Sequence, residues 1–466
     1  MASEKAVYPI HVSPKIVKQG FGYKLCGFLI ALEAWRRGLT VKLEDASFKR
    51  YSISDNNTEV RFIRSRSSLT KNKAIVITKN KQLTREYLQA AGVPTPAGKL
   101  FESCNLKDIE KFASEIGFPV VLKPLDGSLG NGVVTDISGS ESLAEAFDYV
   151  HNKLGFKKLV LEKQVWGDDF RAFVIAGRVA SVVKRVPANV VGDGKSTISE
   201  LIDQKNAERK LNPFLSTGLI KKDEEVNRYV EKNGFTMSSV ILQGEKLRLR
   251  GKANASAGAD VIDVTDSIPE FAKDAAVRAV SCIPDLAYCG VDVMYDEATN
   301  SCHIIELNAQ SQIGVNIYPS EGEGKDLARA IVDTCFPNSP YIKNKFDSKL
   351  VFDTSSLSKA FMSHSVEKIV LRKPSLANLK KIKRSYCVFS TSDVLLKKKI
   401  SVLLKDHNVD GFISKKDNDF QLMVSGDVKE VESFFGKFFD SLSEVNLMFT
   451  KRWVGLVKSG FFINLS

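Results

Sequence analysis

The chain alternates between segments with hydrophobic residues at helical spacing and short apolar runs typical of strands. Between Gly22 and Gly38, leucine, phenylalanine and tryptophan recur three or four positions apart, which predicts a helix that Gly38 ends. A short strand is expected at residues 40–43. Further helices are expected at residues 82–91, 106–116, 199–209, 271–282 and 325–335, and further strands at 118–123, 158–162, 171–175, 290–294 and 303–308. This mixture predicts an α/β and α+β protein.

The last ninety residues have a pattern of their own. Strands are expected at 385–391, 409–414, 420–424 and 446–456, and helices at 393–406 and 428–442. The order βαββαβ predicts a ferredoxin-like domain. Polar, serine-rich sequence precedes it and predicts a linker, and residues 210–235 form a polar, lysine-rich insertion. The expected domains are an N-terminal α/β pre-domain at 1–75, a central domain at 76–340, a linker at 341–376 and the C-terminal domain at 377–466.

Composition is that of a globular protein, with 466 residues, 43% of them hydrophobic and 26% charged. The apolar run from Leu25 to Ala34 contains Glu33 and is too short to span a bilayer, so no membrane partner is expected. The first fifteen residues lack an apolar signal core. The seven cysteines are an odd number without a CxxC motif, which predicts a reduced, cytoplasmic protein.

A net charge of +12 raises the alternative of a nucleic-acid-binding protein. The basic residues are spread along the chain, however, and the densest runs are only Lys380 to Arg384 and Lys397 to Lys399. Solvated basic faces and a pocket for an anionic nucleotide account for the charge, so no nucleic-acid partner is expected. The five histidines form neither a triad-like nor an HExxH pattern, which gives no support to a hydrolase or zinc enzyme.

Two stretches carry the candidate chemistry. An apolar strand ends at Lys123 and is followed by a loop with Gly127, Gly130 and Gly132. Such a loop lets backbone N–H groups approach phosphate oxygens, and a lysine at its base adds a positive charge. Far downstream, Asp292, Glu306 and Asn308 stand at the polar ends of two apolar strands. Hard oxygen ligands of this kind suit Mg²⁺ that bridges nucleotide phosphates. Together the two stretches predict an ATP site.

These stretches resemble the ATP-grasp superfamily, and more narrowly the ligase module of cyanophycin synthetase-like proteins and amino-acid ligases. The resemblance runs from about residue 75 to 337 and includes further blocks at residues 80–96, 161–171, 184–187, 192–196 and 249–256. It implies ATP and Mg²⁺, expected as two ions with Mn²⁺ as an alternative. It also implies a reaction that joins a carboxylate to an amine through an acyl phosphate, with an amino acid or peptide as substrate.

The resemblance also implies roles for individual residues. Lys81 and Lys123 would contact the α and β phosphates, and the backbone of Ser128, Gly130, Asn131 and Gly132 would cover the phosphate end. Adenine would lie along Glu162, Lys163, Gln164 and Val165, and the ribose against Asp169. The reaction centre would be formed by Arg185, Arg250 and Asn254, with Arg171 as a further candidate for holding phosphate. Asp292, Glu306 and Asn308 would bind the metal.

The C-terminal domain resembles acylphosphatase at residues 408–412, 420–426 and 431–435. The phosphate-binding arginine is absent from Ser390 to Asp393, and Lys415 stands where a catalytic asparagine belongs. A non-catalytic relative is therefore expected. Two alternatives stay open: an ATP-binding regulatory protein without turnover, and association of identical chains.

Overall fold

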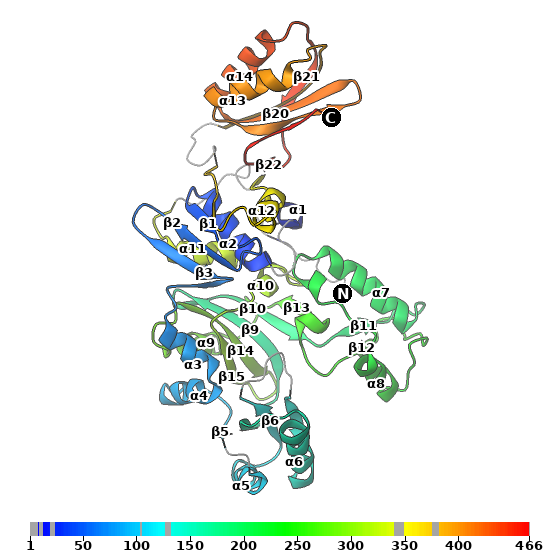
Figure 1. Ribbon diagram of the computed structural model, residues 1–466. Helices are drawn as coiled ribbons and strands as arrows, with labels where there is room; N and C mark the ends of the chain where they lie inside the picture. The colour runs from blue at the N-terminus through cyan, green and yellow to red at the C-terminus, as the bar shows by residue number, and fades with distance from the viewer. Residues whose placement is uncertain are drawn as a thin grey trace. The chain divides into compact units, whose positions relative to one another are not determined.

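The computed structural model describes residue 8 and residues 13–18, 24–102, 105–125, 132–339, 349–374 and 382–465. These residues divide into two compact units (Figure 1). The first consists of Tyr8 and residues 65–334, and the second of the described residues at 13–64 and from 335 onward. Within the described residues, no helix is long and apolar enough to cross a membrane.

An antiparallel sheet of five strands forms the centre of the first unit. Its order is β13 (Asp260–Asp263), β10 (Arg178–Val186), β9 (Asp168–Ile175), β14 (Tyr288–Asp296) and β15 (Ser301–Asn308). Side chains alternate across a strand, so Phe170, Ala172 and Val174 point to one face, where they pack with alanines of α9 (Glu270–Ser281). Helix α3 (Asn72–Lys79) adds Ala74 and Ile77 to this core. The opposite face carries Asp169 and Arg171 of β9 next to buried apolar residues such as Phe173 and Val183.

A second antiparallel sheet has the order β5 (Gly98–Phe101), β8 (Leu159–Lys163), β6 (Val120–Pro124) and β7 (Val134–Ile137). Helices α5 (Leu106–Ile116) and α6 (Ser140–Phe147) share its apolar core, and a π-helix η4 (Asp148–Lys153) continues α6. Helix α4 (Lys81–Ala90) begins at Asn80, whose side chain accepts hydrogen bonds from two backbone N–H groups. The helices expected at 82–91 and 106–116 are thus confirmed, the second to the residue.

A smaller cluster in the first unit has its own core. Strands β11 (Asn189–Val191) and β12 (Lys246–Arg248) pair, and α7 (Ile198–Leu211) and α8 (Glu224–Lys232) pack with them. The segment expected to be a polar insertion therefore contains a helix, because Val226 and Val230 give α8 one buried face. The remaining elements of this unit are β4 (Arg66–Ser67), η5 (Leu215–Thr217), η6 (Ala255–Ala257) and α10 (Gly314–Ile317), and α11 (Leu327–Cys335) follows them.

The second unit begins with α1 (Pro14–Val17), α2 (Leu25–Arg36), β1 (Thr40–Leu43), β2 (Arg50–Ser54) and β3 (Glu59–Ile63). Elements from beyond residue 348 complete this part: β16 (Leu350–Val351), α12 (Thr354–Met362) and β17 (Ile369–Val370). Strand β17 pairs with β1, and the ring of Phe352 contacts those of Phe28, Trp35 and Phe48. The described part of the segment expected to be a linker is therefore folded against the pre-domain. The domain boundaries themselves stay predictions.

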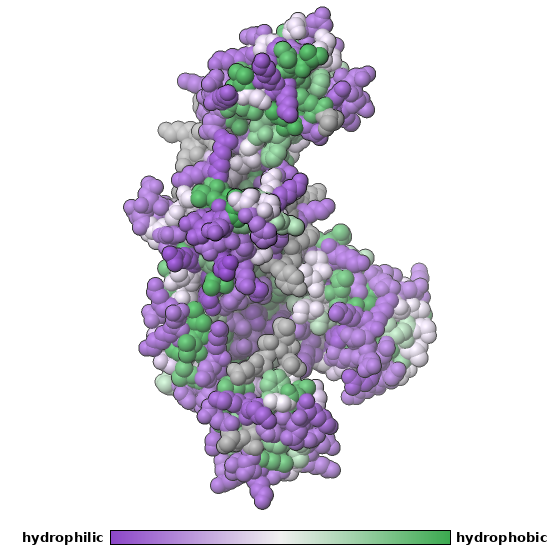
Figure 2. All heavy atoms as spheres, viewed as in Figure 1, coloured by the Kyte–Doolittle hydropathy of each residue, from purple (hydrophilic) through white to green (hydrophobic). Residues whose placement is uncertain are grey.

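The C-terminal residues form the expected ferredoxin-like arrangement. The elements are β18 (Ile382–Ser390), α13 (Leu396–Asp406), β19 (Asp410–Lys416), β20 (Asp419–Asp427), α14 (Val428–Asp440) and β21 (Asn446–Arg452). Two strands were not predicted: β22 (Val457–Lys458) pairs with β16, and β23 (Phe461–Asn464) extends the sheet, whose order is β21-β18-β20-β19-β23. Hydrophobic residues interrupt the hydrophilic surface of this domain (Figure 2), and Leu447 and Phe449 of the edge strand β21 are among those exposed.

Candidate active site

One face of the five-stranded sheet brings together half of the charged residues that the sequence singles out. The backbone register places Arg185 of β10 opposite Asp169 of β9. In the next row, Arg171 of β9 lies opposite Asp292 of β14, and Asp292 lies opposite Glu306 of β15. Asn308 stands two positions beyond Glu306 and so shares its face. Residues separated by more than a hundred positions in sequence thus form one cluster.

Asp292 is the centre of this cluster. Arg171 donates to both of its carboxylate oxygens, from Nε to Oδ1 and from Nη2 to Oδ2, the latter at 3.0 Å. Arg185 Nη2 lies 3.2 Å from Oδ1, and Asn308 Nδ2 donates to Oδ2 at 3.3 Å. Burial acts to raise the pKa of Asp292, but the two guanidinium groups outweigh it and the pKa is lowered. Asp292 is therefore an ionised, buried carboxylate.

Asp169 behaves differently although it lies beside the same arginine. Arg185 donates to its Oδ1 from Nη2 at 2.5 Å and from Nε at 3.1 Å. Burial nevertheless raises the pKa of Asp169 to about 6, and the nearby Asp292 carboxylate adds to the rise against the attraction of Arg185. Two neighbouring carboxylates on one face thus titrate in different pH ranges.

The donor set on β14 and β15 fits a magnesium ion held jointly with phosphate. Glu306 is exposed and Asp292 lies opposite it across the strands, with the Asn308 amide beside them. Across the described residues, histidine, cysteine, aspartate and glutamate form no group of three or more that could hold a metal by itself. Mg²⁺ is commonly bound through one or two carboxylates plus substrate phosphates. This face can supply those carboxylates.

A second cluster of charge lies on β6, β8 and α4. Glu162 of β8 accepts from Lys123 Nζ at 2.5 Å through Oε2, and from Arg85 through Oε1. Lys81 Nζ donates to the Leu125 carbonyl oxygen at 2.8 Å. A small cavity lined by Lys81, Arg85 and Glu162 is also lined by Glu306 of β15. The two clusters therefore border one space in the first unit.

Other residues of the predicted nucleotide site have structural contacts. Lys163 Nζ donates to the carbonyl oxygens of Gly117 and Phe118, and Gln164 exchanges hydrogen bonds with Asp136. Val165 follows β8 and is partly buried. Gly132 has a φ of 72°, and a Cβ there would lie 3.2 Å from atoms of Pro124 and Phe156, which explains the glycine. Ser128, Gly130 and Asn131 lie outside the described residues.

Within the described residues, Arg250 and Asn254, both predicted at the reaction centre, make no hydrogen bond or ion pair with Asp292. Arg250 is bound to Asp223 and Glu225 at the start of α8 and to the Lys221 carbonyl oxygen. Asn254 accepts from the backbone N–H of Ser256 and caps η6, as a turn residue would. In the described part of the chain, the structure thus brings Arg185 to Asp292 but does not bring these two residues there.

The sequence analysis did not predict the residues that contact the basic side chains of the candidate site. Arg85 stands four positions after Lys81 on α4, so helical spacing could have placed both on one face. The ion pairs of Arg250 with Asp223 and Glu225 could not be predicted from the local sequence. The two acidic residues lie in the stretch that was predicted to be a polar insertion.

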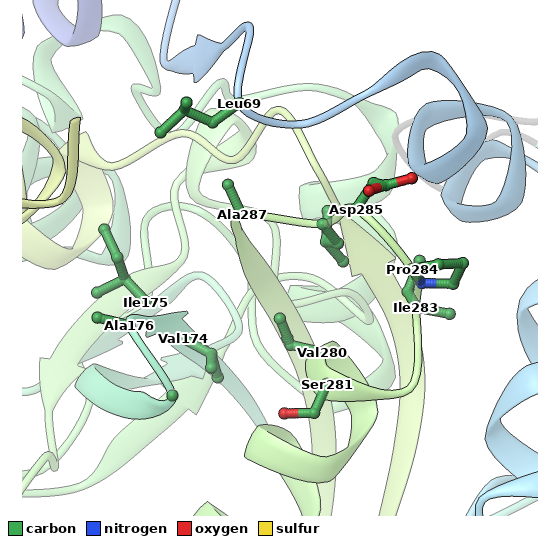
Figure 3. A pocket seen from close by; sticks show the side chains of 12 residues that line it. Leu69, Val174, Ile175, Ala176, Val280, Ser281, Ile283, Pro284, Asp285 and Ala287 are labelled. Atoms are coloured by element: carbon green, nitrogen blue, oxygen red, sulfur yellow. The ribbon is translucent and has the colours of Figure 1, made fainter.

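A larger hollow, of about 400 Å³, lies elsewhere in the first unit (Figure 3). It is bordered by Ile175, at the far end of β9 from Asp169, and by Val280 and Leu286. Asp285 is the only charged side chain among its lining residues. Phosphate groups require cations or N–H donors, so this hollow does not suit a nucleotide.

The central sheet, with its acidic and guanidinium residues, and the neighbouring lysine-bearing sheet agree with the resemblance to ATP-grasp ligases. Over 272 residues the chain is 33% identical to cyanophycin synthetase of Crocosphaera subtropica, covering 57% of this chain and 31% of that protein. Over 322 residues it is 30% identical to the glutathione biosynthesis bifunctional protein GshAB of Clostridium perfringens, covering 66% of this chain and 40% of that protein. The predicted resemblance to ATP-grasp ligases is confirmed.

A solved structure agrees with this fold. The crystal structure of a bifunctional glutathione synthetase from Pasteurella multocida matches with a TM-score of 0.52 and 24% identity, covering 66% of this chain and 43% of that one. The chain spans less than half the length of these relatives. No family model matches the chain.

Proposed function

We propose that this protein is an ATP-dependent carboxylate–amine ligase, which forms an amide or peptide bond through an acyl phosphate on an amino acid or peptide. The observation that carries the proposal is the pairing of Asp292 with Glu306 across β14 and β15, with Arg171 and Arg185 on the same face. Relatives named as a cyanophycin synthetase and a glutathione biosynthesis protein support the substrate class.

In this proposal the nucleotide occupies the space bordered by both charged clusters. Lys81 and Lys123 hold its phosphates. Lys81 lines that space, and Lys123 is paired with Glu162, which also lines it. The segment from Glu162 to Val165 contacts adenine and Asp169 the ribose. Asp292, Glu306 and Asn308 would hold Mg²⁺, which would supply positive charge to neutralise the transferring phosphoryl group.

Catalysis then depends on cations placed where negative charge develops. A substrate carboxylate attacks the γ-phosphorus atom and ADP leaves, which gives the acyl phosphate. The amine then attacks the acyl carbon and inorganic phosphate leaves. Both steps concentrate negative charge, and the planar guanidinium of Arg185 is suited to bind phosphate oxygens. Arg250 and Asn254 are proposed to line the same reaction centre. Arg250 must then either break its ion pairs with Asp223 and Glu225 or bind phosphate while keeping them.

The direct test is phosphate release from ATP by the full chain in the presence of single amino acids and short peptides. Hydroxylamine added to the same reaction traps an acyl phosphate as a hydroxamate. Release and hydroxamate that both depend on one carboxylate substrate support the ligase. ATP binding without release under every condition favours a regulatory ATP-binding protein instead.

A further inference from the structure

Asp292 is a proposed metal ligand, but its closest contacts are with an arginine and not with the neighbouring proposed ligand Asn308. Arg171 lies directly opposite Asp292 across β9 and β14 and binds both carboxylate oxygens. The Nη1 atom of the same guanidinium donates to Ser311 Oγ at 3.3 Å, so all three of its nitrogens are used. Arg171 and Asp292 are both largely buried, with side-chain exposures of 13% and 11%.

Each carboxylate oxygen of Asp292 already has two donors, Arg171 and Arg185 at Oδ1 and Arg171 and Asn308 at Oδ2, so a metal ion must displace one of them. A guanidinium and a divalent cation also repel each other. The face itself carries the charges of Asp169, Asp292 and Glu306 against those of Arg171 and Arg185, which leaves one negative charge when all are ionised. Nucleotide phosphates bring more negative charge than this face can balance, and they offer a guanidinium a better-matched bidentate partner.

We propose that Arg171 is a placeholder cation, which occupies Asp292 in the nucleotide-free protein and leaves it for phosphate when nucleotide and metal bind together. The inference rests on the proposed function and adds a regulatory property to it. Metal binding at Asp292 and Glu306 then depends strongly on nucleotide, and the affinity of this site for metal ions alone is low. Arg171 is a positioning residue for the metal ligands in this role.

The experiment measures metal binding and not turnover. Mn²⁺ is titrated into the full chain by paramagnetic resonance, first alone and then with a non-hydrolysable ATP analogue. For the wild type we expect binding of Mn²⁺ alone to be weak and binding with the analogue to be much tighter. In Arg171→Met the affinity for Mn²⁺ alone should rise by about tenfold, because one positive charge next to the carboxylate is removed.

Two further variants serve as controls for the effect of removing the charge of Arg171. Lys184 lies on β10 and is paired with Asp168, outside the Asp292 contacts, so Lys184→Met removes the same charge from the same sheet and should leave binding of Mn²⁺ alone unchanged. Arg171→Lys keeps the charge but loses the two-pronged contact, so it should give a smaller rise than Arg171→Met. It also provides the test if Arg171→Met does not fold.

Equal affinity for Mn²⁺ alone in the wild type and in both Arg171 variants, with analogue-dependent binding intact in the wild type, would overturn the placeholder role while leaving the proposed function standing. A wild type that binds neither the analogue nor Mn²⁺ in its presence would overturn the proposed function, and the placeholder with it.

Discussion

The ammonium group of Lys123 lies 2.5 Å from the carboxylate of Glu162, and both side chains are about nine-tenths buried. Arg85 takes the other oxygen of the same carboxylate. Because burying a charge is costly, the three groups hold one another in place. In the proposed nucleotide site, Lys123 is thus held in place before a nucleotide arrives, which reduces the ordering needed on binding.

Replacing Lys123 with methionine should weaken nucleotide binding about tenfold or more, since a charged hydrogen bond to phosphate is lost. Titration calorimetry with a non-hydrolysable ATP analogue measures this loss. Lys99→Met is the matched control, because Lys99 is exposed on β5 of the same sheet. Equal affinities for the two variants would remove Lys123 from the site.

Glu306→Gln should abolish most turnover without affecting stability. Glu306 is exposed, and exposed substitutions away from special features usually change the free energy of unfolding by less than about 0.5 kcal/mol. The loss of one anionic ligand should nevertheless lower the rate strongly. Substrate-dependent phosphate release measures the turnover, and urea unfolding measures the stability. Near-normal release by the folded variant would contradict the assignment of Glu306 as a metal ligand.

Asp292→Asn should differ from Glu306→Gln in its effect on stability. The neutral amide leaves the guanidinium of Arg171 buried without its counter-charge, and breaking a buried ion pair costs about 3–5 kcal/mol. We therefore expect turnover to fall and the urea midpoint to fall with it. Equal midpoints for the two variants would show that the Arg171–Asp292 pair contributes little to the folded state.

The raised pKa of Asp169 predicts a pH-dependent stability. Its pKa of about 6 in the folded state is above its usual value of 3.8, so the folded state binds this proton more tightly than the unfolded state. The contribution of Asp169 to the free energy of unfolding therefore decreases, by on the order of 2 kcal/mol, as pH rises from about 4 to about 6, and is constant above that. Asp169→Asn should remove this decrease. Urea unfolding at pH 4.5 and pH 7 checks it, and an unchanged difference between the two pH values would contradict the assignment.

The sequence predicts best where one strand or helix buries one face against a neighbouring layer. Helix α5 and strand β1 match the expected residues because their apolar spacing is unambiguous. Strand β17 has only two residues and exists through its pairing with β1, more than three hundred residues earlier, so no local pattern could reveal it. The ion pairs of Glu162 with Arg85 and Lys123 were not predicted for the same reason, because the two partners come from other elements.

The C-terminal domain should lack acylphosphatase activity. In the loop after β18, Asp393 is bound to Lys399 and to the Leu395 backbone N–H, which leaves a carboxylate where a phosphate would need a cation. The full chain, assayed with a generic acyl phosphate without ATP, should hydrolyse it no faster than buffer does. A fragment beginning at Ser385 would not be a fair test, since it removes the first three residues of β18. Hydrolysis that survives Asp292→Asn would point to a working site in this domain.

The contacts of Trp35 predict where the chain can be shortened. Trp35 is fully buried in α2, its ring lies 5.4 Å from that of Phe352, and its Nε1 donates to the Arg372 carbonyl oxygen at 2.7 Å. A chain that ends at Asn338 loses both partners and strand β17, whereas one that ends at Pro374 keeps them. Both lack the C-terminal domain, so they differ only in the segment that packs on the pre-domain.

The two truncations should therefore differ in the fluorescence of Trp35. The only other tryptophan left in either chain is the exposed Trp166, so both are made in a Trp166→Phe background. We expect the emission of the chain ending at Pro374 to match a buried indole, and that of the chain ending at Asn338 to shift to longer wavelength because water reaches the ring. Binding of the ATP analogue, which depends on residues of the first unit, should persist in both. Identical emission from the two chains would show that residues 349–374 are not needed to keep the pre-domain core closed.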